Sequence, residues 1–316
     1  MIVVLAAVGL LAATQDMRSL FAGIKSISLM PLLAGTSLFI IANFFVAVRW
    51  KGLLNTLDIY LPVWAAAKIT FVGMFYNNML LSNIGGDLLR VWYVAKYTDK
   101  RLEAAFSVVA DRLCGFAACI IMAIAGLLFS KGLFVNAASG DTQPVEAQGT
   151  PLLVKLAVAA FISFAVFAIA AIVFWKMGKL DDAIVKVKSH IKRFTAAIVL
   201  YLKNPMSLVK AMAITLAAQS VSVLGIYVAC SSLDIDAPMK VYFIVFPLSW
   251  VIGALPVSPG GLGVLELGVV AMFASMPQVS PEQALTLALC QRLIFLAGSM
   301  PGLLIHLGGF HLPKTE

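Results

Sequence analysis

Six ionisable side chains fall inside segments of this chain that are otherwise apolar: Asp87, Arg90, Asp111, Arg112, Glu266 and Arg292. A charge in the hydrocarbon core of a membrane costs about 2.5–3.5 kcal/mol on insertion scales, so such residues pair with one another or line a wet cavity. Arginine binds phosphate oxygens two at a time, and a neighbouring carboxylate can balance its charge or take up a proton. These six residues are therefore the first candidates for a binding site.

Two glycine pairs interrupt the apolar sequence just ahead of two of the acids. Gly85-Gly86 precedes Asp87, and Gly260-Gly261, in a turn that also contains proline, precedes Glu266. Glycine and proline do not continue a regular helix, and broken backbone at membrane depth persists only where protein buries it or it lines a wet cavity. Each turn is expected to open a short helix whose N–H groups could bind a phosphate.

A second shared pattern follows each glycine pair. Residues 104–113 and 284–293 both begin with alanine and both carry an arginine and a leucine eight and nine positions later, which gives Arg112 and Arg292 matching places. Two linked matches in the same order indicate an internal repeat. We expect a single membrane domain, residues 1–316, with repeats at 1–130 and 151–316.

The segments Ser82–Arg90 and Pro256–Glu266, together with Asp111-Arg112, resemble the membrane region of lysylphosphatidylglycerol synthases and their stand-alone flippase-like relatives. The resemblance runs from about Arg49 to about Gly309. In the two-domain members, this region is associated with moving a phospholipid between leaflets, while a separate soluble domain makes the lipid. The resemblance therefore implies lipid transport. We expect no synthase activity, because the sequence carries no such soluble domain.

The composition is that of an integral membrane protein. The chain is 61% hydrophobic and 12% charged, whereas a soluble domain has about a quarter charged residues. Long apolar runs without period-two alternation predict an all-α polytopic fold. The net charge of +8 does not indicate nucleic-acid binding, because the basic residues gather in one loop, residues 176–210. No nucleotide-binding or metal-ligand spacing is present, so no cofactor and no metal are expected.

Hydropathy predicts about six full transmembrane helices and two re-entrant hairpins. The spans are residues 2–13, 30–48, 104–129, 151–175, 211–231 and 281–307. Arg49-Trp50-Lys51 is interpreted as the membrane boundary that ends the second span. The hairpins are residues 62–98 and 241–276, and a competing topology makes residues 62–82 a full span.

The distribution of lysine and arginine predicts the orientation. The loop at 176–210 is cytoplasmic, those at 130–150 and 232–240 are outside, and both termini are cytoplasmic, in the inner membrane. The hairpins then enter from opposite faces, which makes the second half an inverted copy of the first. In such inverted-topology repeats the substrate site lies near the midplane, between the two copies.

Two interpretations of the charged residues remain open. In the first, Arg112 and Arg292 hold a phosphate-bearing head group, with Arg90 and the glycine turns in the same site and Asp87 and Glu266 balancing the charge. In the second, Arg112–Glu266 and Arg292–Asp87 are ion pairs that only lock the repeats together.

The function predicted from these patterns is a flippase or lipid permease for an anionic, phosphate-bearing lipid. The alternatives are an intramembrane transferase acting on a lipid carrier and a non-catalytic partner of a lipid-synthesis enzyme. The enzyme is less favoured because no acidic metal pair and no histidine lies near the hairpins. The expected partners are the anionic lipid and the surrounding membrane, with a second copy of the chain or a lipid-synthesis enzyme as further alternatives.

Overall fold

The structure is a computed structural model that describes residues 27–79, 85–129, 199–201, 203–233, 235–253, 263–274, 276 and 278–309. The described residues form helices and the turns between them, and none of them lies in a strand. The helical class expected from the sequence is confirmed.

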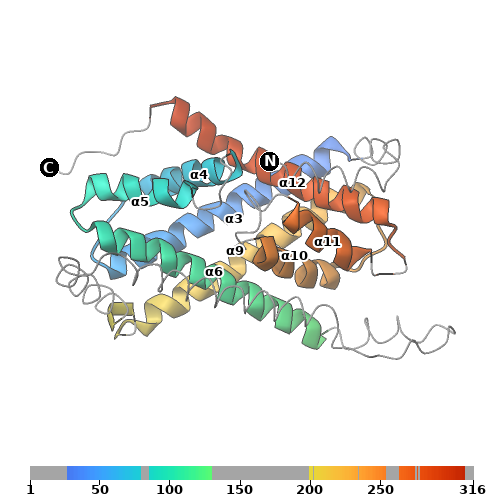
Figure 1. The fold of residues 1–316 in the computed structure, drawn as a ribbon, viewed down its shortest axis with the longest axis horizontal. Coiled ribbons are helices and arrows are strands. Elements are labelled where there is room, and N and C mark those ends of the chain that lie inside the picture. The colour runs from blue at the N-terminus through green and yellow to red at the C-terminus, as the bar shows by residue number, and fades with distance from the viewer. Residues whose placement is uncertain are drawn as a thin grey trace, which may run out of the picture.

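Four helices form each half of the described chain (Figure 1). The first half contains α3 (Leu29–Thr56), α4 (Val63–Met79), α5 (Gly85–Tyr97) and α6 (Arg101–Phe129). The second half contains α9 (Pro205–Ala229), α10 (Met239–Gly253), α11 (Val264–Phe273) and α12 (Pro281–Leu307), with a 3-10 turn, η2 (Cys230–Ser232), after α9.

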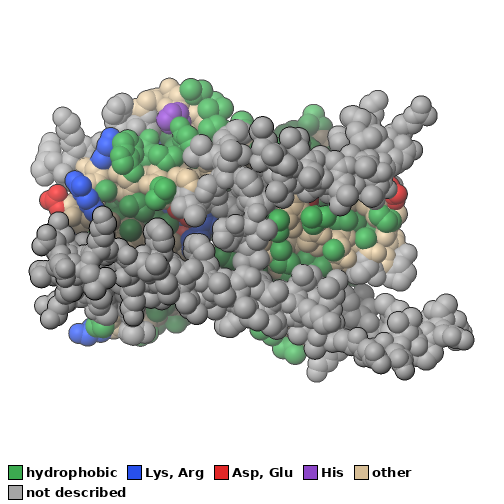
Figure 2. Space-filling model, in the orientation of Figure 1, with side chains coloured by type: hydrophobic (Ala, Val, Ile, Leu, Met, Phe, Trp, Pro, Cys, Tyr) green, Lys and Arg blue, Asp and Glu red, His purple; other side chains and the backbone are tan. Residues whose placement is uncertain are grey.

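Four of these helices, α3, α6, α9 and α12, are long and apolar enough to cross a membrane. They correspond to four of the six predicted spans, and the bounds of α12 agree with the prediction. The other two predicted spans, 2–13 and 151–175, lie outside the described residues. Figure 2 shows that much of the described surface on one face is hydrophobic, as the surface of a membrane-spanning bundle requires.

Helix α3 does not end at Arg49-Trp50-Lys51, where the sequence predicts the end of the second span. Helix α3 continues for another five residues to Thr56, and both Arg49 and Trp50 are buried. The continuation occurs because Leu53 and Leu54 extend the apolar face of the helix and are themselves fully buried. Arg49 therefore lies inside the helical bundle.

Helices α3 and α9 cross at a pair of glycines. A Cβ at Gly35 would collide with the carbonyl oxygen of Gly225 and would lie 2.7 Å from Ala229 Cβ, while a Cβ at Gly225 would lie 2.8 Å from the carbonyl oxygen of Gly35. Small residues that let two backbones touch are the usual contact between membrane helices. This crossing joins the two halves of the chain.

A Gly35→Ala substitution should therefore destabilise the bundle by about 1–3 kcal/mol, because the added methyl group separates the two backbones. Gly52 on the same helix is the matched control, since a Cβ there meets nothing within 4 Å. Gly52→Ala should be neutral or stabilising by up to about 1 kcal/mol. Unfolding in mixed micelles measures both, and equal stability of the two variants would contradict the close crossing.

The remaining helices pack in a reciprocal way. Helix α4 packs on α5 and on α12, and α10 packs on α11 and on α6, so each short helix pair also contacts the last long helix of the other half. The close approach between α4 and α5 is at Gly73 and Gly86, where a Cβ on Gly86 would collide with the Gly73 carbonyl. The corresponding approach between α10 and α11 is at Gly253 and Leu265.

Candidate functional site

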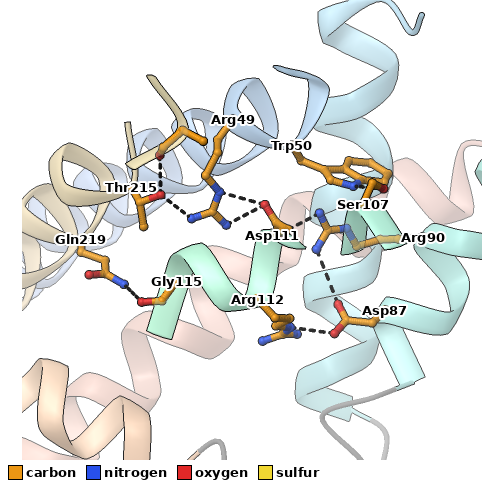
Figure 3. A network of polar contacts seen from close by, with 11 residues as sticks. Arg49, Trp50, Asp87, Arg90, Ser107, Asp111, Arg112, Gly115, Thr215 and Gln219 are labelled. Carbon is orange, nitrogen blue, oxygen red and sulfur yellow. Dashed lines mark hydrogen bonds and ion pairs between the residues drawn. The ribbon is translucent and has the colours of Figure 1, made fainter. Parts of the chain in front are cut away.

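A buried carboxylate, Asp111 on α6, binds two arginines from different helices (Figure 3). Arg49 Nε on α3 donates to Asp111 Oδ1 at 2.8 Å, and Arg90 Nη2 on α5 donates to Asp111 Oδ2 at 3.1 Å. Arg49 Nη1 also donates to Thr215 Oγ1 on α9 at 2.9 Å. All four side chains are buried. The two guanidinium groups thus bind one carboxylate oxygen each. A charge buried in an apolar bundle is costly unless it is paired and hydrogen-bonded.

An aromatic side chain supports the second of these arginines. The guanidinium carbon of Arg90 lies 4.2 Å from the centre of the Trp50 ring, which is the geometry of a cation–π contact. Trp50 is held in turn, because its Nε1 donates to Ser107 Oγ at 3.1 Å. Arg90 is therefore fixed between an indole face and a carboxylate.

A second carboxylate, Asp87 at the start of α5, extends the network to Arg112. Arg112 Nε donates to Asp87 Oδ2 at 2.7 Å, and Arg90 Nη1 lies 3.5 Å from Asp87 Oδ1. The Arg112 side chain is 43% exposed, whereas that of Asp87 is 15% exposed. Of the three arginines in the network, Arg112 is thus the most accessible.

The other half of the chain contains a separate ion pair of the same kind. Arg292 Nε on α12 donates to Glu266 Oε1 at 2.6 Å. Glu266 Oε2 accepts from the N–H of Gly263 at 2.8 Å, where the backbone takes a φ of 82° that favours glycine. The carboxylate therefore both caps α11 and binds the arginine.

The proposed cross-repeat pairs, Arg112–Glu266 and Arg292–Asp87, are thus wrong. Each arginine binds the acid of its own half, because α6 packs directly against α5 and α12 packs directly against α11. Contact between the two halves is made instead by the crossing of α3 and α9 and by the packing of α4 on α12 and of α10 on α6.

The network forms one wall of a cavity of about 340 Å³ inside the bundle. Its charged lining residues are Arg49, Asp87, Arg90, Asp111 and Arg112. Among the described residues that line the cavity, three arginines and two aspartates carry a net charge of +1. The rest of the lining combines amide and hydroxyl side chains with apolar and aromatic ones, among them Phe39, Asn43, Thr70, Asn78, Phe116, Gln219, Trp250 and Phe295.

Other residues of the predicted site lie elsewhere or are already bonded. Arg292 and Glu266 are not among the residues that line this cavity. The N–H of Gly86 donates to Asn77 Oδ1 at 2.8 Å, so the expectation that it is free to bind a phosphate does not hold in this structure. Gly85 begins α5 as expected, whereas Gly260 and Gly261 lie outside the described residues.

Two parts of the cavity wall are not predicted by the sequence patterns. The sequence patterns place Arg49 at a membrane boundary. They also do not single out the polar face of α9, where Thr215, Gln219 and Ser222 line the cavity. Both have a signal in the sequence. Leucines continue the apolar pattern beyond Arg49, and the three polar residues of α9 recur at spacings of four and three, which places them on one helix face.

The fold and the cavity define a multi-pass helical membrane protein with a charged cavity within its bundle. The family model described as "Lysylphosphatidylglycerol synthase TM region" matches residues 1–302, so the chain belongs to this family. The membership confirms the resemblance found in the sequence.

Two curated relatives carry the name "UPF0104 membrane protein", both from Methanothermobacter thermautotrophicus. One is 26% identical over 269 residues, which covers 81% of this chain and 78% of the relative. The other is 25% identical over 284 residues, which covers 80% of this chain and 78% of the relative. No solved structure matches the chain.

Proposed function

We propose that this protein moves an anionic, phosphate-bearing lipid between the leaflets of the cell membrane. The observation that carries the proposal is the cavity with three arginines and two aspartates inside an apolar bundle. Burying these charges is expensive, and a structural role would be served by a neutral, fully paired set. The set has an excess positive charge, which one phosphodiester would neutralise.

Arg112 is proposed as the residue that first binds the phosphate. Its side chain is the most exposed of the three cavity arginines, and its Nε binds Asp87. The guanidinium group keeps donors beyond Nε that can bind phosphate oxygens. Arg49 and Arg90 lie deeper and keep the cavity positive.

The matched positions of the two ion pairs support the inverted-topology repeat, which is part of the proposal. Asp87 and Glu266 are each the third residue of a short helix, and Arg112 and Arg292 are each the twelfth residue of the following long helix. The twelfth residue lies about 16–17 Å along the helix from the first, which is near the middle of a bilayer core of about 30 Å. The helix pairs α4–α5 and α10–α11 are then the two re-entrant hairpins, entering from opposite faces.

Transport would follow from alternating use of the two halves. Here the first ion pair lines a cavity and the second is less exposed, since the side chain of Arg292 is 14% exposed. In the inverted conformation, Arg292 and Glu266 would line the cavity and Arg112 and Asp87 would be covered. The two arginines would thus bind the phosphate in turn.

The test is leaflet exchange in proteoliposomes, with a tail-labelled fluorescent phosphatidylglycerol whose outer-leaflet copies are quenched by dithionite. Arg112→Gln should slow exchange by at least about tenfold, because a charge-assisted interaction with the phosphate is lost. Arg112→Lys should retain part of the rate, since lysine keeps the charge and loses the bidentate geometry.

Arg101→Gln is the matched control, because Arg101 is an exposed residue of the same helix that does not line the cavity. It should leave the rate unchanged. A labelled phosphatidylcholine should exchange no faster with the protein than without it. Exchange of the anionic lipid at the unmodified rate by Arg112→Gln would refute the phosphate-binding role.

A further inference from the structure

Helices α4 and α12 come from different halves of the chain and pack against each other (Figure 1). At the closest point, a Cβ on Gly302 of α12 would collide with the carbonyl oxygen of Phe71 on α4 and would lie 2.9 Å from Phe75 Cβ. The two backbones therefore touch, which brings polar groups of one helix within reach of the other. This contact between α4 and α12 is called the seam below.

Two hydrogen bonds cross the seam. Tyr76 Oη on α4 lies 3.1 Å from His306 Nε2 on α12, in an exposed position where the two rings meet edge-on. Asn78 Nδ2 on α4 donates to the carbonyl oxygen of Phe295 on α12 at 3.3 Å. Asn78 and Phe295 both line the cavity, whereas His306 is exposed. The seam therefore lies between the cavity and the surface of the bundle.

The seam joins two hydrophobic cores that are packed separately. Buried apolar residues of α4 share one core with Trp50 of α3, Val94 of α5 and Val108 of α6. Those of α12 share another core with residues of α9, α10 and α11. Among the described residues, no buried side chain of either helix belongs to the core of the other. Separation at the seam would therefore leave both cores intact.

The corresponding contact of α10 on α6 is built differently. Met122 and Ala123 of α6 belong to the same core as Ile244 of α10. A Cβ on Gly126 of α6 would collide with the Ile244 side chain, so the two helices are in close contact there. Separation of α6 from α10 would open a hydrophobic core. Of the two contacts, the seam is the one that can part without unpacking a core.

Helix α12 also contains a point at which it can bend. Pro301 lies inside the helix, between Phe295 at the cavity and His306 at the surface. Proline has no N–H to donate, so the carbonyl oxygen of Ala297 lacks its helical partner. Prolines inside helices are a common cause of kinks. The section from Pro301 to Leu307 can therefore change its angle at a small cost in backbone hydrogen bonds.

We propose that the seam is the gate of the transport cycle. Helices α4 and α12 separate there, with Pro301 as the hinge, while the crossing of α3 and α9 keeps the two halves joined. Opening breaks the contact between Tyr76 and His306 and connects the cavity with the surface of the bundle. The gating role rests on the proposed function, whereas the motion of the seam rests on the contacts between α4 and α12.

A bridging zinc ion can hold the gate closed. Tyr76→His places a second imidazole beside His306, and zinc binds imidazole nitrogens at about 2.0–2.1 Å, so one ion can join the two rings. Zn²⁺ at about ten times its dissociation constant should bridge about nine-tenths of the molecules, and EDTA should release them. The matched control is the double variant Tyr76→His with His306→Gln, which has one imidazole at the seam.

The motion of the seam is measured by double electron–electron resonance between two nitroxide labels. Tyr60, which adjoins the core of α4, and Leu304 on α12 are both exposed, and the four native cysteines are buried. Cysteines at these two positions carry the labels. The Tyr76→His chain should show a shorter and a longer distance, and Zn²⁺ should leave only the shorter one. The single-imidazole control should not respond to Zn²⁺.

The hinge has a variant of its own. Pro301→Ala restores the N–H that can bind the Ala297 carbonyl, so the share of the longer distance should fall by roughly twofold to tenfold, as expected for one hydrogen bond. Met300→Ala is the matched control, because it changes the neighbouring side chain and leaves the backbone donors unchanged. Equal shares in the two variants would contradict the hinge at Pro301.

The same Tyr76→His chain is then used for leaflet exchange in proteoliposomes, with Zn²⁺ on both sides of the membrane. The rate should fall about tenfold at about ten times the dissociation constant, because only the unbridged molecules can open. EDTA should restore the rate, and the single-imidazole control should keep it throughout.

The outcomes separate the gate from the proposed function. A single label distance that Zn²⁺ leaves unchanged would overturn the gate, as would failure of the Tyr76→His chain to bind Zn²⁺. Unchanged exchange by bridged molecules would overturn the gate and leave lipid transport standing. If Zn²⁺ removes the longer distance in a chain that moves no lipid, the opening at the seam is confirmed and the proposed function is contradicted.

Discussion

An Asp111→Asn variant is expected to lose about 3–5 kcal/mol of unfolding free energy, because it strands two buried guanidinium groups. Arg49 and Arg90 both donate to this one carboxylate, and all three side chains are buried. An asparagine keeps one acceptor oxygen but removes the charge. The excess of positive charge at the cavity then rises from one to two.

Adding Arg49→Met to Asp111→Asn restores the original excess charge and should recover part of the loss. A double-mutant cycle measured by unfolding in mixed micelles should give a coupling of about 1–3 kcal/mol between the two positions. Asp58→Asn is the control, since its ion pair with Lys100 is 3.6 Å long and the Asp58 side chain is 66% exposed. An exposed pair of this kind contributes at most about 1 kcal/mol. Similar losses for Asp58→Asn and Asp111→Asn would contradict the central role of Asp111.

Glu266→Gln should also cost about 3–5 kcal/mol, because it removes the counter-charge of Arg292. Glu266 in addition accepts from the Gly263 N–H, so the start of α11 would lose a charged cap. The contact between Glu266 and Arg292 joins α11 to α12. Its loss should therefore loosen the second half of the bundle.

Two double-mutant cycles distinguish the observed pairing from the Arg112–Glu266 pairing that the sequence left open. Glu266→Gln with Arg292→Met should be less damaging than the sum of the single changes, by about 1–3 kcal/mol. Glu266→Gln with Arg112→Met should be additive, because Arg112 binds Asp87. Additivity in the first cycle, or coupling in the second, would show that the pairing is different from the one described.

The sequence determined the membrane class, the helices and their breaks. Four apolar runs predict spans, and α3, α6, α9 and α12 correspond to them, although α3 continues past the charged residues that follow its run. Short helices after the glycine pairs were also expected, because glycine does not continue a regular helix, and α5 begins at Gly85. These features depend on local backbone chemistry and on the cost of exposing polar groups to lipid.

The sequence also requires each charge within an apolar segment to have a partner. The apolar residues around them are enough to single out Asp87, Arg90, Asp111, Arg112, Glu266 and Arg292. The requirement follows from the cost of a lone charge in hydrocarbon, which does not depend on the fold. It does not say which acid each arginine binds.

Only the tertiary structure decided the partners. An arginine and an acid at matched places in the two halves can pair within or across the halves, and the outcome depends on which helices touch. Helix α6 packs on α5, so Arg112 binds Asp87, and α3 continues past its apparent boundary, which brings Arg49 to Asp111. Helix packing sets distances between residues far apart in sequence, and ion pairs form only where those distances fall within a few ångströms.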